Sequence, residues 1–356
     1  MRRLVSSLFV AGLLLAAAAH AAGVPAPAPP PAFDRFFTDP ALAETRAVIV
    51  MQNGRIVAER YGKGYGPANR LIGWSMSKSV TAMLIGQLVG AGKLSLDAPA
   101  PVAAWRTPGD PRGKITLRHL LNMASGLQHD ELGRPAVQDA DTNRALFADQ
   151  SRDVAAFAEG KPLTDPPGAR FTYSSLTSVI LADIAVRTIA PQARTPAERR
   201  VAMRAYLKAN LADPVMPSLI CDFDAAGTMI GGSFCHATPR DWARFGQLYL
   251  DDGVAGGRQI VPRAWVALVR TPSPADPGYT THFWLNRPRA PGKPAALFPK
   301  QGPADLYSAI GHLGQYVMVV PSKHLVVVRL GKTQDDVLDP VRDAMGALVA
   351  SYPNAP

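Results

Sequence analysis

A serine and a lysine three positions apart, Ser75 and Lys78, have the clearest chemical potential in this 356-residue chain. They open the segment 75–89, which contains no proline and is mostly apolar, so it predicts a helix. Because positions i and i+3 share one helix face, the Lys78 amine can reach the Ser75 hydroxyl. A serine hydroxyl needs a base before it attacks, and a lysine whose pKa is lowered by burial can be that base.

The alternative for this pair is a helix-capping serine beside a surface lysine, because the S-x-x-K pattern often arises by chance. The residues that follow, Val80 to Ile85, are mostly apolar and predict a largely buried helix. A buried lysine requires a reason, since burial of an unpaired charge is costly. This setting favours the chemical interpretation.

Two further stretches could complete such a site. Tyr173 follows a Pro-Pro-Gly turn and precedes a helix predicted over 174–189, so its phenol could project into a cleft; a core tyrosine is the alternative. His312 and Gly314 lie in Gly-His-Leu-Gly-Gln, where the chain enters a predicted strand, and a glycine there would let a substrate approach the backbone. A simple strand-entry turn is the alternative for that stretch.

The elements around these residues predict an α/β (α+β) fold. Asn53-Gly54 predicts a hairpin over 47–60, and a second β-branched hairpin is predicted over 316–330. Further helices are predicted over 116–123, 151–158, 198–210, 239–250 and 338–350. We expect an antiparallel sheet that is built from both termini and flanked by helices, with a mainly helical region inserted. The α/β domain would comprise 33–97 and 221–356, and the inserted region 98–220.

The N-terminus has the three parts of a secretory signal peptide over residues 1–21. Arg2 and Arg3 are followed by an apolar run and by the small residues of an A-x-A cleavage site. A membrane anchor is the alternative, although the run is shorter than the roughly 20 apolar residues that span a bilayer. Residues 22–32 form a Pro/Ala-rich linker. We therefore expect an exported protein, periplasmic or secreted, without a stable membrane anchor.

The charge and the cysteines limit the remaining classes of function. Lys+Arg 38 against Asp+Glu 28 leaves a net charge of +10, but these charges are scattered, which argues against a nucleic-acid partner. The histidines lack metal-ligand spacing, so we expect no metal and no cofactor. Cys221 and Cys235 either form a disulfide or remain two buried thiols. His119 is expected to be structural, and Trp284 to lie in the core rather than along a cleft.

Ser75-x-x-Lys78, Tyr173-Ser-Ser175 and His312-x-Gly314 together resemble the motifs of the serine β-lactamase/penicillin-binding-protein superfamily. The resemblance is strongest to the class C β-lactamase-like serine hydrolases, which include esterases and 6-aminohexanoate-dimer hydrolase-like amidases. It implies a β-lactamase/transpeptidase-like fold over nearly the whole chain after the leader.

By this resemblance Ser75 would be the acylated nucleophile, and Lys78 would accept or relay its proton. Tyr173 would act as the base in acylation, as the acid toward the leaving group, and then on the water of deacylation. The backbone N–H groups of Ser75 and Gln315 would form the oxyanion hole.

Two departures bear on the substrate. Ser175 stands where the β-lactamases usually have asparagine, and His312 stands where they usually have lysine. A neutral imidazole binds a substrate carboxylate less strongly than an ammonium does. With Ser175, His312 and Gly314 at the substrate, we expect a carboxylesterase or amidase that acts on a small ester or amide. The alternatives are a β-lactamase, a D-alanyl peptidase, or a non-catalytic penicillin-binding-like cell-wall protein; the oligomeric state is open.

Overall fold

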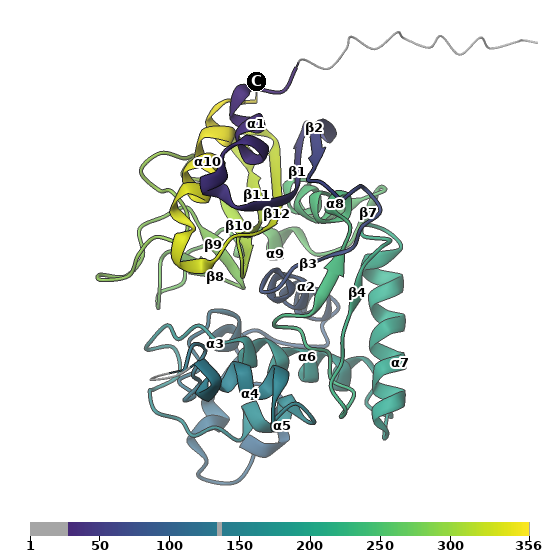
Figure 1. The fold of residues 1–356 in the computed structure, drawn as a ribbon. Helices are drawn as coiled ribbons and strands as arrows, with labels where there is room; N and C mark the ends of the chain where they lie inside the picture. The colour runs from purple at the N-terminus through teal and green to yellow at the C-terminus, as the bar shows by residue number, and fades with distance from the viewer. Residues whose placement is uncertain (1–27, 134–136, 356) are drawn as a thin grey trace, which may run out of the picture.

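The computed structural model describes residues 28–133 and 137–355 (Figure 1). The predicted signal peptide, 1–21, lies outside the described residues, as does most of the predicted linker. The first helix, α1 (Pro31–Thr38), begins inside that linker, two residues before the expected start of folded structure. Proline is well tolerated in the first helical turn, because its missing N–H would have no helical partner there.

A seven-stranded antiparallel sheet joins the two ends of the chain, as the sequence predicts. Its strand order is β2-β1-β12-β11-β10-β9-β8. The N-terminal strand β1 pairs with the last strand β12 over eight residue pairs, from Glu44 with Lys332 to Gln52 with Leu325. The strands are β1 (Glu44–Gln52), β2 (Arg55–Tyr61), β8 (Tyr279–Thr280), β9 (Phe283–Leu285), β10 (Tyr307–Gly311), β11 (Gln315–Val320) and β12 (Leu325–Lys332).

Both predicted hairpins form within this sheet. Asn53 and Gly54 have φ values of 51° and 73°, the left-handed pair that a type I′ turn needs. A short 3₁₀ turn, Pro321–Lys323, joins β11 to β12. The short strands β8 and β9 at the other edge were not predicted, because two or three residues carry too little periodicity to identify a strand.

Helices cover both faces of the sheet. On one face α1 and α10 (Asp339–Ala350) pack over the apolar side chains of β1, β11 and β12. On the other face lies α8 (Pro239–Leu250), which contacts the same three strands. A Cβ on Gly246 would lie 2.5 Å from Cγ1 of Val326, so the glycine permits the close approach of α8 to the sheet.

The helical region lies below the sheet in Figure 1, and α2 (Met76–Gly90) lies between the two parts. α2 packs against α6 (Ser175–Ile189), which also contacts α3, α5 and α7. The remaining α-helices of the described residues are α3 (Leu117–Leu121), α4 (Asp141–Phe147), α5 (Val154–Glu159), α7 (Pro196–Leu207) and α9 (Arg263–Leu268). Helices α1, α4 and α9 were not predicted, whereas the predicted helices form with ends shifted by a few residues.

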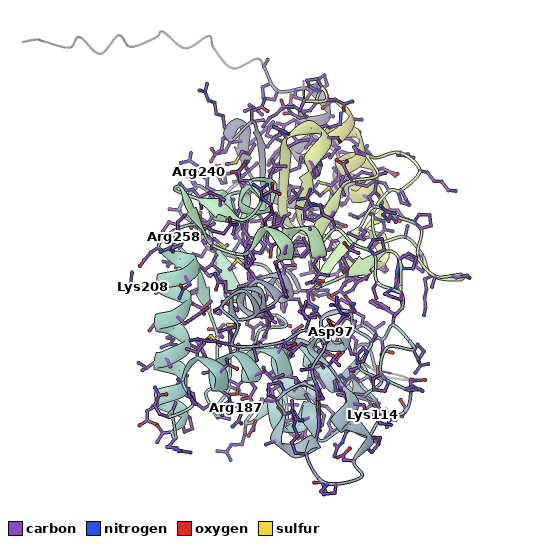
Figure 2. The ribbon with its side chains drawn as sticks, turned by 180° about the vertical axis from the view of Figure 1, so that it is seen from behind. Asp97, Lys114, Arg187, Lys208, Arg240 and Arg258 are labelled. Atoms are coloured by element: carbon purple, nitrogen blue, oxygen red, sulfur yellow. A yellow bond between two sulfur atoms is a disulfide. The ribbon has the colours of Figure 1, made fainter. Side chains whose placement is uncertain are left out.

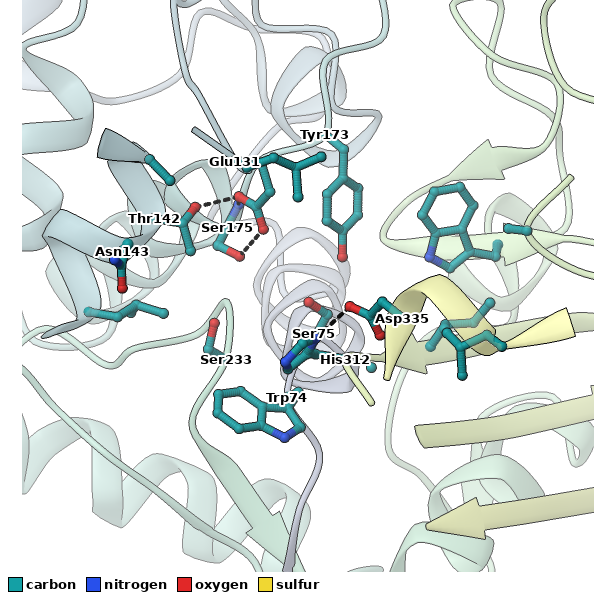
Figure 3. A pocket seen from close by; sticks show the side chains of 18 of the residues that line it. Trp74, Ser75, Glu131, Thr142, Asn143, Tyr173, Ser175, Ser233, His312 and Asp335 are labelled. Atoms are coloured by element: carbon teal, nitrogen blue, oxygen red, sulfur yellow. Dashed lines mark hydrogen bonds and ion pairs between the residues drawn. The ribbon is translucent and has the colours of Figure 1, made fainter. Parts of the chain in front are cut away.

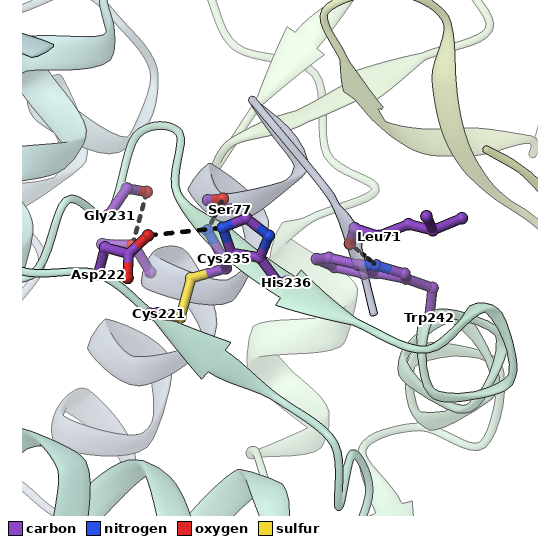
Figure 4. Close-up of a disulfide and its surroundings, with 9 residues drawn as sticks. Leu71, Ser77, Cys221, Asp222, Gly231, Cys235, His236 and Trp242 are labelled. Carbon is purple, nitrogen blue, oxygen red and sulfur yellow. Dashed lines mark hydrogen bonds and ion pairs between the residues drawn. A yellow bond between two sulfur atoms is a disulfide. The ribbon is translucent and has the colours of Figure 1, made fainter. Parts of the chain in front are cut away.

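A small three-stranded sheet has the order β3-β5-β4. It pairs the strand that precedes α2 with two strands that follow α7 in the sequence. Cys221 and Cys235 are directly paired across β4 and β5 and form a disulfide (Figure 4). These strands are β3 (Leu71–Ile72), β4 (Ile220–Cys221) and β5 (Cys235–Ala237), and a separate hairpin consists of β6 (Val254–Ala255) and β7 (Arg258–Gln259).

Charged side chains are dispersed over the outside of the molecule, as the labelled residues in Figure 2 show. Several of them form ion pairs, including Arg118 with Asp97 and Arg240 with Glu59. None of the helices within 28–133 and 137–355 is both long enough and apolar enough to cross a bilayer.

Candidate active site

Ser75 stands at the N-terminus of α2, at the floor of a cavity of about 610 Å³ (Figure 3). The residue before it, Trp74, has a φ of 47°, which is uncommon for a residue with a side chain. A Cβ on Gly73 would lie 2.5 Å from the Trp242 ring, so the chain turns sharply in a tight space. This turn presents the Ser75 side chain to the cavity, and backbone strain of this kind clusters at functional sites.

Lys78 lies beneath Ser75 and is only 1% exposed. Its Nζ is 2.8 Å from Oγ of Ser75, 2.8 Å from Oγ of Ser175 and 2.8 Å from the carbonyl oxygen of Gly232. Three acceptors match the three N–H bonds of an ammonium. Burial lowers the pKa of Lys78 to about 8, and the negative charge of Glu131 opposes this shift. The surface-lysine alternative is therefore wrong.

Tyr173 reaches the cavity from the segment just before α6, and its hydroxyl points toward Ser75 in Figure 3. The Lys78 amine lies 4.8 Å from the centroid of its ring. Burial raises the pKa of the Tyr173 phenol well above its ordinary value, and the charge of Glu131 raises it further. A hydrogen bond with Ser75 acts in the opposite direction. The three residues that the sequence motifs singled out thus meet at one point.

Ser175 lines the same cavity, but its polar groups already have protein partners. Its hydroxyl donates to Oε1 of Glu131 at 2.7 Å, and its backbone N–H donates to Oε2 at 2.6 Å. Thr142 also donates to Oε2 of Glu131, at 2.5 Å. Glu131 was not predicted from the sequence, because it lies in a loop without a motif and reaches α6 only through the tertiary fold.

His312 lines the cavity opposite, next to the ring of Trp74, with the two ring centroids 5.4 Å apart. Its Nδ1 lies 2.5 Å from Oδ2 of Asp335, whose Oδ1 accepts from the backbone N–H of Leu313 at 3.0 Å. Asp335 was not predicted from the sequence either. The imidazole that stands at the position of the β-lactamase lysine is thus paired with a carboxylate, a partner that the sequence did not predict.

Gly314 and Gln315 have structural partners in the turn between β10 and β11. Gly314 has a φ of 78°, and a Cβ there would lie 2.5 Å from Nη1 of Arg329, so close packing accounts for this glycine. Gly314 is not among the described residues that line the cavity. The Gln315 side chain is buried and bonds both backbone groups of Gly331, at 2.8 and 2.9 Å. Gln315 is the first residue of β11, and the strand before it lies close to the Ser75 turn. A Cβ on Gly311, at the end of β10, would lie 2.2 Å from the Gly73 carbonyl oxygen.

The cavity walls are mainly apolar. Trp284 is half-buried and contacts the Tyr173 ring with centroids 5.5 Å apart, so the expectation that it lies in the core rather than along the cleft is wrong. Leu132 and Phe147 are 68% and 64% exposed and stand at the mouth. Further large apolar side chains of the wall include Leu146, Ile310 and Leu338.

Two histidines outside the cavity have structural contacts. His119 accepts from the Thr116 backbone N–H at 3.2 Å and completes a capping box at the start of α3, as expected of a structural histidine. His282 bonds Ser178 and the Leu121 carbonyl at 3.0 Å each, and burial lowers its pKa to about 3. Within the described ranges no cluster of three or more histidine, cysteine or acidic side chains could hold a metal ion.

A serine–lysine pair beneath a tyrosine, set between an antiparallel sheet and a helical region, defines a β-lactamase/transpeptidase-like fold. Residues 33–351 match the model of the beta-lactamase family, and the chain belongs to this family of hydrolases.

Individual relatives agree with this assignment. The chain is 26% identical to a 6-aminohexanoate-dimer hydrolase of Paenarthrobacter ureafaciens over 305 residues, 82% of this chain and 73% of the relative. The structure is similar to that of a β-lactamase from Mycobacterium bovis, with a TM-score of 0.63, 20% identity and coverage of 90% and 99% of the two chains. It is also similar to a family VIII carboxylesterase, with a TM-score of 0.63, 14% identity and coverage of 90% and 98%.

Proposed function

We propose that this protein is an exported serine hydrolase of the carboxylesterase or amidase type that forms an acyl-enzyme on Ser75. The observation that carries the proposal is the 2.8 Å contact between the buried Lys78 amine and the Ser75 hydroxyl at the floor of an open cavity. A nucleophile with a base in hydrogen-bond reach is the arrangement that covalent acyl transfer requires.

In acylation, Lys78 in its neutral form takes the proton of Ser75 while Oγ attacks the acyl carbon. The direction of the two pKa shifts supports this assignment, since burial brings Lys78 to about 8 and moves Tyr173 away from the phenolate form. We therefore assign the role of base to Lys78. The resemblance of the motifs alone had implied Tyr173 in that role. Tyr173 donates a proton to the leaving oxygen or nitrogen as the acyl bond breaks.

The proton balance closes over the two half-reactions. The Ser75 proton leaves with the alcohol or amine by way of Lys78 and Tyr173, so both groups return to their starting state. In deacylation, water attacks the ester on Ser75, its proton returns to Oγ through the same groups, and the acid departs. We assign the oxyanion to the backbone N–H groups of Ser75 and Gln315.

The cavity favours a neutral substrate with an apolar group. Its walls are mainly apolar, and the only described carboxylates that line it are Glu131 and Asp335. Among the described residues, the basic side chains that line the cavity are His312 and Arg342. His312 is paired with Asp335 and Arg342 with Asp339, so neither is left unpaired for a substrate carboxylate. Penicillins and D-alanyl peptides carry such a carboxylate, so we place esters and linear amides before them. The name of one relative supports an amide, and that of another supports an ester.

Hydrolysis of p-nitrophenyl esters, linear amides and a chromogenic cephalosporin by the purified protein tests this proposal. We expect turnover of the esters or the amides that Ser75→Ala abolishes, and little turnover of the cephalosporin. A non-catalytic cell-wall protein would turn over none of them. Export is tested separately, since N-terminal sequencing of the periplasmic or secreted protein should show cleavage near Ala21.

A further inference from the structure

We propose that Glu131 is a positioning residue that aims the lone pair of Lys78 at Ser75, and that it does so by holding the hydroxyl proton of Ser175. This inference rests on the proposed function, because it concerns the base of that reaction. It starts from a donor and acceptor count around the Lys78 amine, which has described partners on three elements of the fold.

A neutral lysine amine has two N–H bonds and one lone pair, so only one of its three neighbours can donate to it. The Gly232 carbonyl, 2.8 Å away, can only accept. The hydroxyls of Ser75 and Ser175, each 2.8 Å away, could both donate. If Ser175 donated, the lone pair would point away from the nucleophile and the base would be idle.

The Glu131 carboxylate removes this competition. Its Oε1 takes the Ser175 hydroxyl proton at 2.7 Å, which leaves that oxygen able only to accept from Lys78. Its Oε2 takes the Ser175 backbone N–H at 2.6 Å and the Thr142 hydroxyl at 2.5 Å. A carboxylate has acceptors only, so it cannot return a proton to this network. Ser75 remains the sole donor to the amine.

The backbone next to Glu131 is itself held in place. Asp141 is buried, and its Oδ2 accepts the backbone N–H of Asp130 at 2.9 Å, one residue before Glu131. Lys161 holds the other oxygen of Asp141 at 2.5 Å. A braced loop is what a positioning role requires, because the carboxylate must keep one orientation while the substrate changes.

The groups that face Lys78 come from several elements. Glu131 raises the pKa of Lys78 through its charge, against the lowering by burial. Tyr173 faces it from the start of α6 and is a neutral phenol, since burial raises its pKa. His282 faces it from the β8–β9 turn and is neutral above about pH 3, in part because of the charge of Lys78. Glu131 is thus the one anionic group that acts on the amine among the residues described.

Glu131→Gln is the decisive variant, because glutamine keeps the shape but not the acceptor pattern. Two donors, the Ser175 N–H and the Thr142 hydroxyl, meet at the Oε2 position, so the amide carbonyl will occupy it. The NH₂ group then faces the Ser175 hydroxyl and turns its proton toward Lys78. We expect kcat on a p-nitrophenyl ester to fall about tenfold at the high-pH plateau, equivalent to about 1.4 kcal/mol, with KM little changed.

The pH profile separates positioning from a structural role. Loss of the carboxylate removes a charge that raises the pKa of Lys78, so the acid limb of kcat/KM should move to lower pH while the plateau falls. Asp130→Asn is the matched control. In the wild type, Oδ1 of Asp130 accepts hydrogen bonds from the backbone N–H groups of Leu132 and Gly133, at 3.1 and 2.9 Å. The asparagine side chain keeps an oxygen that can accept both. This variant should leave the profile unchanged.

Ser175→Ala completes a double-mutant cycle, since it removes the competing donor. In the Ser175→Ala background, Glu131→Gln should cost little further kcat, whereas independent effects would multiply. The inference is overturned if Glu131→Gln, folded by its melting curve, keeps the wild-type plateau, or if the two losses multiply. Failure of the proposed function is a different result, because the wild-type protein would then show no acylation of Ser75 at all.

Discussion

The Lys78 amine donates to the carbonyl oxygen of Gly232, which lies 154 positions further along the chain and 2.8 Å away. A carbonyl accepts from an amine as well as from an ammonium, so this contact holds the nitrogen in both states without adding a full negative charge. The lysine is therefore fixed in place while its pKa stays low, at about 8. A carboxylate in the place of Gly232 would pin the nitrogen but would favour the ammonium.

The pH dependence of the reaction follows from this pKa. Only neutral Lys78 can take the Ser75 proton, and the neutral fraction rises as pH rises through about 8. We expect kcat/KM to increase about tenfold per pH unit below that value and to level off above it. Stopped-time ester assays across pH 6 to 10, corrected for spontaneous hydrolysis, measure this profile. If the rise of kcat/KM below pH 8 persists unchanged in Lys78→Ala, a group other than Lys78 is responsible for it.

Gly232→Ala should displace the backbone carbonyl that holds the Lys78 amine, while the lysine itself is unchanged. A Cβ at this position would lie 2.6 Å from the Ser175 carbonyl oxygen, so the backbone that supports Lys78 must shift. We expect kcat to fall at least tenfold and the melting temperature to fall with it. Gly66→Ala is the control, because a Cβ there meets only the Asn69 side chain at 3.7 Å. Wild-type kcat in Gly232→Ala would contradict the support that we assign to this carbonyl.

Tyr173→Phe removes one hydroxyl and leaves the ring contacts with Trp284 and Lys78 in place. We expect kcat/KM to fall by roughly 10²–10³, as for loss of a general acid. The loss should be larger for an alkyl ester than for a p-nitrophenyl ester, because a poor leaving group needs the proton more. Tyr249→Phe, at a buried phenol of α8 that does not line the described cavity, should leave the rate unchanged. Equal losses for both esters would remove Tyr173 from the acid role.

The parts of this site that depend on local spacing could be predicted from the sequence. Ser75 and Lys78 face one another because they are one helical turn apart, and His119 caps α3 through a box that spans four residues. Glu131 and Asp335 could not be found in this way. Glu131 belongs to a loop and Asp335 to a one-turn 3₁₀ helix, Asp335–Val337. Each meets its partner, Ser175 or His312, only after the helical region or the sheet has folded. Trp284 was misplaced because an aromatic in a short strand carries no sign of the face it occupies.

The disulfide gives a prediction that is independent of catalysis. Non-reduced peptide mapping should recover Cys221 and Cys235 as one linked pair. A bridge that closes a loop of this length contributes about 3 kcal/mol to the free energy of unfolding in the chain-entropy model. Reduction should therefore lower the melting temperature of the wild type but not that of the Cys221→Ser/Cys235→Ser variant. Two thiols that alkylate without prior reduction would contradict the bridge.

Intact-protein mass spectrometry after treatment with a fluorophosphonate tests the acyl-enzyme on Ser75 most directly. We predict one adduct per chain, mapped to the peptide that contains Ser75, and no adduct in folded Ser75→Ala. Labelling that is absent from the wild type, or that survives Ser75→Ala at another residue, would contradict the assignment of the nucleophile.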